Sequence, residues 1–434
     1  MKLSRPRGTR DFLPEEMRIR RYIIDRIRRV FELHGFEEMD TPAIELWEVL
    51  SLKSGEEVEH QIYKFQDKAG RLLGLRFDLT VPLARVIASN PNLVKPFKRY
   101  CIAKVWRYEE PQSGRYREFL QADIDIIGSP NMIADVECIV TAIDAIKAIG
   151  INDIKVKINN RKILEGIFSS MGINKEDLFK VFRIIDKIEK IGEENVIKEL
   201  SNLNLSNEII KDIMDIIHKK GEEALNYVEK NFENIKLVKE GLSELREIIN
   251  LSQLFEINNL IEVDFSLVRG LDYYTGPVFE IKSKEHIVSI AGGGRYDDLI
   301  EKFGGISIPA TGISLGIERL YEILSRKIIS NEPITKIFIA NVNEEVFSEV
   351  IKIYKKLISY GISTEIDLMK RKLTRQLEYS NSKNIPYVLI VGPKEIKEGI
   401  FKLRDMKNKK EYDVKIEEIP KIIKDQIANK SSFN

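Results

Sequence analysis

The sequence predicts an α+β fold in which a strand-rich region is interrupted by a helical segment and followed by a small α/β module. Strand-like stretches with alternating polar and apolar residues occupy much of residues 1–165 and return in residues 256–328. Between them, residues 166–255 are rich in Lys, Glu, Ile and Asn and have helical periodicity. In residues 331–434, short apolar strands alternate with helical stretches, which is the order that builds a small α/β sheet. We therefore divide the chain at these boundaries.

The first elements are predicted from periodicity and from residues that stop helices. Residues 14–33 carry an apolar stripe at helical spacing, and Gly35 in "HGF" ends this amphipathic helix. The next segment, "FEEMDTPAIEL", is strand-like as far as Pro42. "GRLLGLRFDLTVPLARVIASN" is predicted to be a strand that runs into a helix, and a further helix is predicted at about residues 130–149.

Residues 107–128, "RYEEPQSGRYREFLQADIDIIG", combine β-branched residues with many charges. Pro and Gly supply the dihedral angles of a chain reversal, so "PQSG" is predicted to be the turn of a hairpin. Because strand side chains alternate between faces, one face is apolar and carries Leu120, Ala122, Ile124 and Ile126. The other face carries Arg107, Glu109, Arg115, Arg117, Phe119, Gln121, Asp123 and Asp125. A solvated outer face has the same alternation, so a site is indicated only if other segments converge on this polar face.

Strand character returns in "EVDFSLVRGLDYYTGPVFEI" and "HIVSIAGGGRYDDLI", and a helix is predicted around "GISLGIERLYEIL". Asn331–Pro333 is a plausible linker. The strands predicted beyond it are "KIFIANV", "STEIDL" and "YVLIVG". From residue 331 onward the chain has 20 Lys and Arg against 15 Asp and Glu, which is the sign of charge that an RNA-contacting module needs.

Length and composition are typical of an ordinary globular chain. At 434 residues, roughly three domains are expected. The 69 basic and 68 acidic residues give no overall field that would attract nucleic acid. No apolar run approaches the length of a membrane span and no signal-peptide pattern is present, so we expect a cytoplasmic protein without a membrane segment. Cys101 and Cys138 lie in apolar sequence and are expected to be buried thiols.

Several kinds of site are not indicated. The 2 Cys and 4 His lack the spacing of metal ligands, so no metal site is expected. In "AGGGRYDD", Asp297 stands where GxGxxG needs its third glycine, so the run is predicted to be either a tight strand-to-helix turn or a substrate-facing loop. The sequence contains no GxxxxGK[ST] motif. Its arginines, carboxylates, amides and aromatics instead suit an anionic nucleotide together with a small cationic or zwitterionic partner.

These segments resemble the motifs of a known family. "GFEEMDTPAIE" resembles the first motif of class II aminoacyl-tRNA synthetases, whose proline lies at the dimer interface, while the hairpin resembles the second motif and "GISLGIERL" the third. "LVRGLDYYTG" and "AGGGRYDDLI" resemble segments specific to histidyl-tRNA synthetases, and the resemblance extends along essentially the full chain. Asp78 and Asp125, in "LRFDLTVPLAR" and in the hairpin, resemble the archaeal and eukaryotic form. The tail resembles the anticodon-binding domain of several class II enzymes.

The resemblance implies the following organisation and reaction. A catalytic domain with an antiparallel sheet would be formed by residues 1–165 and 256–328, with a helical insertion at 166–255 and an α/β anticodon-binding domain at 331–434. The protein would be a homodimer that activates L-histidine with ATP to histidyl-adenylate and transfers the histidyl group to tRNA(His). Mg²⁺ would be held mainly by the ATP phosphates, and no side-chain nucleophile would be needed.

The resemblance also implies which residues bind ATP. Arg107 would hold the α-phosphate, and Arg115 would reach the terminal phosphates. Glu109 would bind the adenine amino group, and adenine would stack between Phe119 and Arg319.

Histidine would be bound by residues from the hairpin and from the segments around it. Asp78, Thr80 and Gln121 would bind its ammonium group. Asp125 and Tyr274 would bind the imidazole, with Tyr273 and Tyr296 lining the pocket. Arg269 would bridge the substrate carboxylate and the α-phosphate, which makes Arg107 and Arg269 the catalytic residues. The remaining polar residues of these segments are expected to be structural, namely Arg117, Asp123 and Asp272.

Three other interpretations are to be weighed. The regulatory subunit of ATP phosphoribosyltransferase shares the catalytic fold but is expected to lack the tail domain and several of the arginines found here. A sibling synthetase for another amino acid is disfavoured by "LVRGLDYYTG". A protein that only binds RNA would leave the acidic pocket residues without a use.

Overall fold

A computed structural model describes residues 3–52, 60–110, 114–268, 273–304, 306–327 and 333–423. The chain divides into two compact units, Met1–Ile328 and Ile329–Asn434, which are described separately. Asn331 and Glu332 of the predicted linker lie outside the described residues. None of the helices in the described part of the chain combines the length and apolar character needed to span a bilayer.

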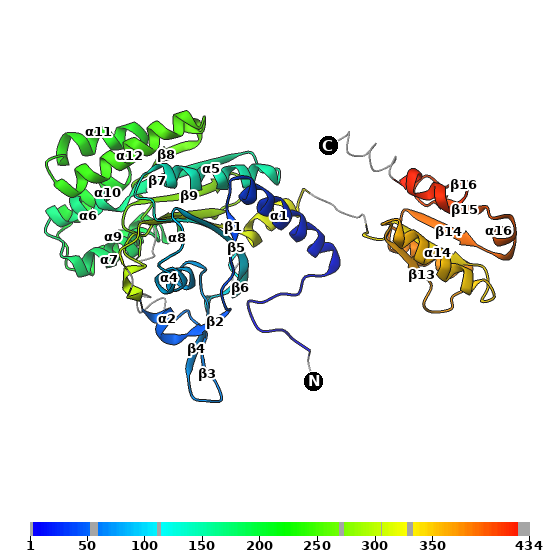
Figure 1. Cartoon of the computed structure of the whole chain (residues 1–434). Helices are drawn as coiled ribbons and strands as arrows, with labels where there is room; N and C mark the ends of the chain where they lie inside the picture. Colours follow the sequence, from blue (N-terminus) through cyan, green and yellow to red (C-terminus); the bar gives the residue numbers. More distant parts are fainter. Residues whose placement is uncertain are drawn as a thin grey trace. The chain divides into compact units, whose positions relative to one another are not determined.

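The larger unit is built on an eight-stranded sheet in the order β1-β5-β6-β11-β10-β9-β7-β8 (Figure 1). Its neighbours pair antiparallel except at the two ends, where β1 runs parallel to β5 and β7 parallel to β8. In that order the strands are Glu37–Glu38, Phe97–Trp106, Glu118–Ile127, Ala310–Gly316, Ala291–Arg295, Pro277–Ser283, Ile154–Asn160 and Ile261–Val263.

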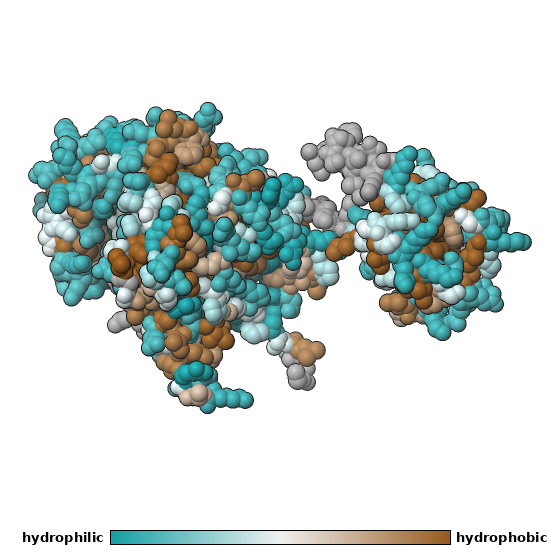
Figure 2. Space-filling view, viewed as in Figure 1, coloured by the Kyte–Doolittle hydropathy of each residue, from teal (hydrophilic) through white to brown (hydrophobic). Residues whose placement is uncertain are grey.

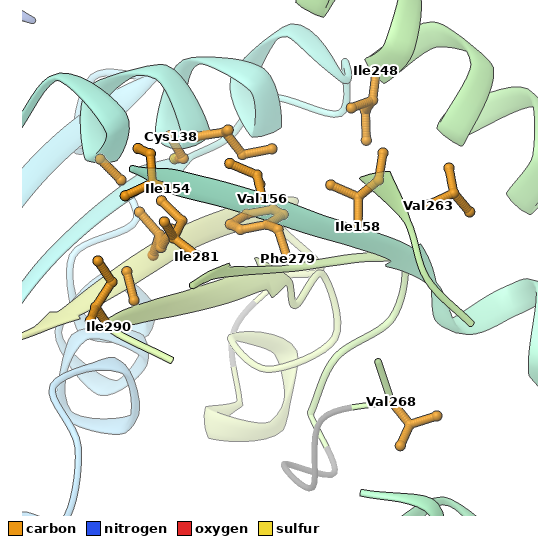
Figure 3. Packing of buried hydrophobic residues seen from close by; sticks show 14 of the residues in the cluster. Cys138, Ile154, Val156, Ile158, Ile248, Val263, Val268, Phe279, Ile281 and Ile290 are labelled. Atoms are coloured by element: carbon orange, nitrogen blue, oxygen red, sulfur yellow. The ribbon is translucent and has the colours of Figure 1, made fainter. Parts of the chain in front are cut away.

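Helices α1 (Pro14–Leu33), α5 (Ile133–Ala148) and α13 (Ile317–Leu324) belong to the apolar side of this sheet, and α1 packs against both of the others. The helices predicted at residues 14–33 and 130–149 are thus confirmed as α1 and α5. Pro14 is at the first helical position, and Glu16 accepts a hydrogen bond from the Leu13 backbone amide at 2.9 Å, which satisfies an N–H at the helix start. Figure 3 shows the packing, with Cys138 of α5 beside the isoleucines and valines of β7 and Phe279 of β9.

The helical segment runs from α6 (Arg161–Ser170) to α12 (Lys236–Leu254). Between them lie α7 (Lys175–Ile185), α8 (Ile188–Ile191), α9 (Glu193–Ser201), α10 (Asn207–Ile217) and α11 (Gly221–Phe232). α6 follows β7 directly, and α12 packs against α5, α6 and β7. The apolar residues of these helices belong to the same core as the sheet, so the segment is anchored on it.

A small antiparallel sheet lies beside the main one, with β4 (Leu72–Leu75) between β2 (Ile44–Leu46) and β3 (Lys64–Gln66). Helices α2 (Trp47–Ser51) and α4 (Thr80–Ser89) accompany it. "GRLLGLRFDLTVPLARVIASN" is a strand followed by a helix, as predicted.

The smaller unit is a five-stranded sheet in the order β13-β12-β14-β15-β16, with its own apolar core. β13 (Thr364–Ile366), β12 (Ile337–Asn341) and β14 (Tyr387–Val391) are parallel and are the three predicted strands. Helices α14 (Phe347–Ser359), α15 (Leu373–Ser382) and α16 (Pro393–Glu398) connect strands of this unit. The prediction missed the antiparallel pair β15 (Phe401–Asp405) and β16 (Lys410–Val414), because these strands contain many charged residues.

The predicted hairpin is confirmed as the β5–β6 pair, but its connection is longer than expected. β5 ends at Trp106 and β6 begins at Glu118, so Arg107, Glu109, Arg115 and Arg117 are not on a strand face as predicted. Backbone groups of the connection pair elsewhere, since the Tyr108 amide donates to the Gln61 carbonyl and the Arg117 amide to the Gly8 carbonyl. The predicted turn residues 111–113 lie outside the described residues.

Two glycine-containing segments also differ from expectation. "AGGGR" is the buried strand β10, neither a turn nor a loop, and the first half of "GISLGIERLYEIL" is strand β11 before α13 begins. A Cβ on Gly293 would lie 2.0 Å from the Gly312 carbonyl oxygen of β11, so only glycine permits this approach of the two backbones. The glycines therefore serve strand packing on the floor of the sheet.

Candidate active site

A pocket of about 560 Å³ lies over the central strands of the large sheet and gathers most of the predicted site residues. The predicted residues that line it are Asp78, Thr80, Arg107, Glu109, Arg115, Gln121, Asp125, Tyr273, Tyr274, Tyr296 and Arg319. Phe119 lines an adjoining pocket of about 170 Å³ that shares Arg107, Gln121 and Arg319 with the first. Arg269, together with Asp272, lies outside the described residues.

The pocket floor is formed by β6, β11 and β10, where glycines leave room for the polar residues of β6. Asp125 of β6 is opposite Gly312 of β11, and a Cβ on Gly312 would lie 2.2 Å from the Asp125 carboxylate. The alternation in β6 is as predicted: Ala122, Ile124 and Ile126 pack in the core, while the odd-numbered residues 121, 123 and 125 line the pocket.

The acidic end of the pocket contains three buried carboxyl groups, Asp78, Asp123 and Asp125. Arg99 of β5, opposite Asp125 in register, forms an ion pair with it at 2.8 Å. Tyr296 donates its hydroxyl to the other Asp125 oxygen at 2.5 Å. Burial raises the pKa of Asp78 to about 6 and that of Asp123 to about 7, and it also raises the pKa of Asp125. This end is therefore short of positive charge and suits a cationic ligand group.

Aromatic rings enclose the acidic end. The rings of Tyr273 and Tyr274 are 4.9 Å apart between centroids, and those of Tyr273 and Tyr296 are 5.9 Å apart. Tyr274 also limits the space above Gly294, where a Cβ would lie 2.8 Å from the ring. Together with Asp125 these rings form an aromatic wall with polar tips, which suits a small planar ring with N–H groups.

The other end of the pocket is rich in guanidinium groups. Arg107 donates to the Phe77 carbonyl at 2.9 Å and lies over the Phe119 ring at 5.3 Å. Arg115 is 3.5 Å from the Glu109 carboxylate, and Arg319 donates to the Ser289 carbonyl. In Arg107 and Arg115, these contacts involve only part of the guanidinium group. Planar guanidinium groups suit phosphate oxygens.

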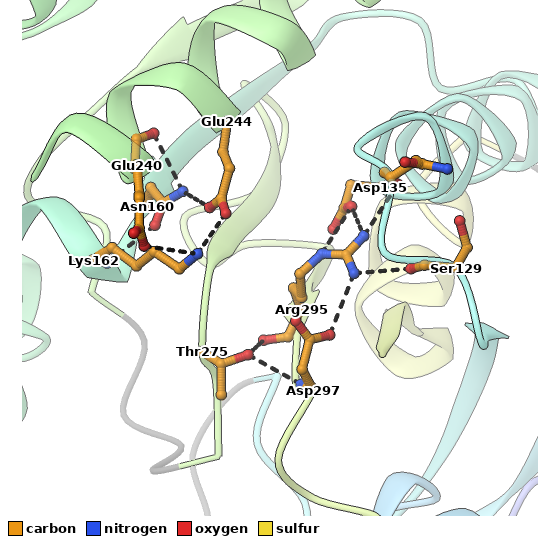
Figure 4. Close-up of polar contacts among 11 residues, drawn as sticks. Ser129, Asp135, Asn160, Lys162, Glu240, Glu244, Thr275, Arg295 and Asp297 are labelled. Carbon is orange, nitrogen blue, oxygen red and sulfur yellow. Dashed lines mark hydrogen bonds and ion pairs between the residues drawn. The ribbon is translucent and has the colours of Figure 1, made fainter. Parts of the chain in front are cut away.

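Figure 4 shows the polar contacts that hold Arg295, the last residue of β10. Its guanidinium forms a buried ion pair with Asp135 of α5 and donates to the Ser129 carbonyl at 3.0 Å. Thr311 donates to the second Asp135 oxygen at 2.7 Å. Arg295 is thus a structural arginine that ties the floor of the pocket to α5.

Sequence reasoning missed several residues that line the pocket. Asp123 was expected to be structural, yet it lines the pocket between Gln121 and Asp125, and its odd-numbered position in β6 was the available signal. Arg99, which is not a lining residue but pairs with Asp125, was not considered either, because only the strand register reveals its partner. Arg183, Asp186, Lys187 and Lys190 come from the helical segment, and nothing in their local sequence points to the pocket. Arg117 is not among the lining residues; it lies over the Tyr108 ring at 4.1 Å.

Comparison with known proteins gives consistent matches over both units. The family model described as "Histidyl-tRNA synthetase" matches residues 8–320, and that described as "Anticodon binding domain" matches residues 336–426. Proteins named histidine–tRNA ligase from Aeropyrum pernix and Pyrococcus furiosus are 43% and 40% identical to the chain. The first match covers 92% of each protein, and the second covers 98% of this chain and 99% of the relative.

Solved structures are similar over the same length. The crystal structure of histidyl-tRNA synthetase from Nostoc sp. is 30% identical, with a TM-score of 0.83 and coverage of 98% of this chain and 100% of that one. A Bacillus halodurans structure, described as an ATP phosphoribosyltransferase regulatory subunit/histidyl-tRNA synthetase, is 25% identical with a TM-score of 0.76. It covers 90% of this chain and 99% of that one.

Buried Asp123 makes a testable contribution to stability. Its pKa in the folded state, about 7, is above the usual value, so the carboxyl favours folding only while protonated, and this contribution is lost as the pH rises through about 7. Asp123→Asn should therefore raise the melting temperature of the ligand-free protein more at pH 8 than at pH 5, because the cost of the buried carboxylate builds up between its usual pKa of 3.8 and about 7. The gain is a few kcal/mol at most, since one pKa unit corresponds to about 1.4 kcal/mol.

The matched control is Asp153→Asn, because Asp153 is half exposed and pairs with Lys284 on the surface. This change should shift stability by less than about 0.5 kcal/mol at either pH. Thermal melts over pH 5–8 provide the measurement. An Asp123→Asn variant that is less stable than wild type at pH 8 would show that the ionised carboxylate stabilises the fold.

Proposed function

Because the chain belongs to the histidyl-tRNA synthetase family, we propose that it activates L-histidine with ATP and transfers the histidyl group to tRNA(His). The observation that carries the proposal is the division of charge within one pocket. Buried carboxyl groups and tyrosines lie at one end, and guanidinium groups lie at the other. A substrate with an ammonium group and an imidazole fits the first end, and a nucleoside triphosphate fits the second.

At the acidic end, Asp78, Thr80 and Gln121 would bind the ammonium group of histidine. Asp125 and Tyr274 would bind the two nitrogens of neutral imidazole, one as donor and one as acceptor. Tyr273 and Tyr296 would pack against the ring. The hydrogen bond from Tyr296 and the ion pair with Arg99 hold the Asp125 carboxylate in one orientation, which supports this assignment.

At the arginine end, Arg107 would bind the α-phosphate and Arg115 the terminal phosphates of ATP. Phe119 and Arg319 would stack on adenine, and Glu109 would accept from its amino group. The family implies the use of ATP. For Mg²⁺, Glu280 lines the pocket with the oxygen ligands that the ion prefers, so we propose that the ion is held mainly by the phosphates with help from this carboxylate. When bound, Mg²⁺ would neutralise phosphate charge.

The reaction joins two anions, the histidine carboxylate and the α-phosphate, and therefore needs positive charge at the point of attack. Arg107 lines both pockets and is near enough to Asp78 for its charge to oppose the effect of burial on that pKa, so it would neutralise both groups as they approach. Arg269 is proposed as the second such residue on the basis of its sequence motif alone. Positioning and electrostatic stabilisation suffice for such a transfer, so no covalent intermediate on a side chain is required.

Pyrophosphate exchange with each of the twenty amino acids tests the proposal. The purified chain should exchange pyrophosphate into ATP with histidine and not with the other amino acids. Exchange with a different amino acid would indicate a sibling synthetase. No exchange at all would favour the regulatory-subunit interpretation, which the match of the tail to an anticodon-binding domain otherwise disfavours.

The anticodon-binding unit should be needed for tRNA and dispensable for activation. The smaller unit has its own sheet and core, so a chain ending at residue 327 should fold. This truncated chain should retain histidine-dependent exchange within about threefold, whereas charging of tRNA should fall at least about a hundredfold, because anticodon contacts are lost. Charging by the truncated chain at the full-length rate would contradict the role given to this unit.

We also propose a homodimer, in which the surface around the first motif forms the interface. Ile44, Leu46, Leu52 and Phe65 are all large apolar residues, and each is between 39% and 47% exposed. Figure 2 shows hydrophobic residues gathered over α2, β2 and β4. A patch of this kind is typical of an interaction site.

Both cysteines are free and buried, which fits the cytoplasmic location that we propose and that cell fractionation can test.

The change Leu46→Lys combined with Phe65→Lys should convert the dimer to a monomer, because a buried lysine is costly in an apolar interface. Light scattering at micromolar concentration measures the mass. Leu254→Lys is the control, since Leu254 is an exposed apolar residue of α12. A wild-type chain that is monomeric and active would overturn the proposal.

A further inference from the structure

The amide side chain of Gln121 is held by a polar contact across the sheet. Gln121 of β6 is opposite Gly316 of β11, which has no side chain, so the glutamine can reach diagonally to the next residue on the same face, Ser314. Its Nε2 donates to the Ser314 hydroxyl oxygen at 2.8 Å. Ser314 is in turn the register partner of Asp123. The three side chains lie together on the pocket floor.

The direction of the hydrogen bonds follows from what each group can donate. Nε2 is the donor of the amide, so the Ser314 oxygen accepts and its own proton is available for another acceptor. Asp123 is opposite Ser314 in the strand register, so its carboxylate lies beside the hydroxyl as the next acceptor; burial raises the pKa of Asp123, and a hydrogen bond with Ser314 acts to lower it. The order of donation is therefore from Gln121 to Ser314 to Asp123.

This order decides which end of the Gln121 amide remains for a ligand. The Nε2 end is occupied by Ser314, while Oε1 is buried and accepts no hydrogen bond from the described residues. A buried acceptor without a donor is costly, and a ligand donor would remove that cost. Asp78 also has a buried oxygen without a partner among the described residues and lines the same pocket, so two acceptors are left for one donor-rich group.

We propose that Asp123 and Ser314 are positioning residues that orient the Gln121 amide with its oxygen toward the substrate, so that the site selects amino acids by their ammonium group. This inference rests on the proposed function, because the ammonium group is that of histidine. Without the Ser314 hydroxyl, the amide can turn over and present its N–H groups, which repel an ammonium ion. We call the hydrogen-bonded series Gln121, Ser314 and Asp123 the relay. It acts on the ammonium group and leaves the imidazole and ATP contacts unchanged.

Two fragments of the substrate separate this role from a general structural one. Histidinol keeps the ammonium group and the imidazole but lacks the carboxylate. 3-(Imidazol-4-yl)propanoate keeps the carboxylate and the imidazole but lacks the ammonium group. Binding of each to the full-length protein is measured by calorimetry, which does not depend on catalysis.

Ser314→Ala should weaken the binding of histidinol about tenfold or more, since a hydrogen bond to a charged group is worth roughly 1.5–3 kcal/mol and 1.4 kcal/mol is tenfold. Binding of imidazolylpropanoate should change by less than about twofold, within the small effects expected of contacts left intact. In exchange assays, the KM for histidine should rise while the KM for ATP stays near the wild-type value.

Ser314→Thr tests rescue, because threonine keeps the hydroxyl and the register partner on β10, Gly292, has no side chain. This variant should bind histidinol with close to wild-type affinity. Ser325→Ala is the matched control, because Ser325 lies at the end of α13, is not among the residues that line the pocket, and donates its hydroxyl to the Glu322 carbonyl. It should leave the affinities for both fragments unchanged.

If Ser314→Ala weakened the binding of both fragments equally, or weakened the binding of neither, the relay would be overturned. The proposed function would stand in that case, provided that wild type exchanges pyrophosphate with histidine. A wild-type chain that neither binds histidinol nor shows histidine-dependent exchange would overturn the proposed function, and the relay with it. Failure of Ser314→Thr to restore histidinol binding would also contradict the relay.

Discussion

The ion pair between Arg99 and Asp125 is the interaction on which the pocket depends. Three carboxyl groups are buried in the pocket, Asp123 and Asp125 on β6 and Asp78 just before α4, and each would be costly in its ionised form without a nearby cation. Arg99 is almost fully buried and is directly opposite Asp125 in the β5–β6 register, and its positive charge acts on both Asp125 and Asp123 against the effect of burial on their pKa values. The register of one antiparallel pair thereby allows an acidic site to exist inside an apolar sheet.

The same register explains why glycines are concentrated on the neighbouring strands. Gly312 and Gly316 stand opposite Asp125 and Gln121, and the missing side chains provide the space that these polar groups occupy. The remaining opposite position is Ser314, small enough to fit and able to bond on both sides. The polar residues of β6 therefore fit beside glycines and a serine on β11, and Asp125 is also held by its ion pair with Arg99 on β5.

The pocket leaves some of its own polar groups unsatisfied, and this is where stability and binding are connected. Oxygens of Asp78, Gln121 and Asp123 are buried without a hydrogen-bond partner among the described residues. The pKa values of Asp78 and Asp123 are raised for the same reason, because these groups are buried without enough partners to compensate their charge. A ligand with a positive donor group supplies what the fold lacks, so part of its binding energy is the relief of this cost. Side chains from α7 and α8 line the same pocket, which joins the helical segment to the chemistry as well as to the core.

By itself the sequence determined those features that depend on local periodicity. The helix at Pro14–Leu33, the alternation along Glu118–Ile127 and the three parallel strands of the tail all follow from the spacing of apolar residues, which neighbours along the chain set. Most of the site residues predicted from the family motifs do line the pocket. Only the tertiary structure decided that "AGGGR" is a strand, that Arg107 and Arg115 lie beyond the strand ends, and that Asp123 belongs to the site. These outcomes depend on which strands become neighbours and in which register. The role of a charged residue such as Arg99 depends on its partner across the sheet, and pairing across the sheet is not encoded in local spacing.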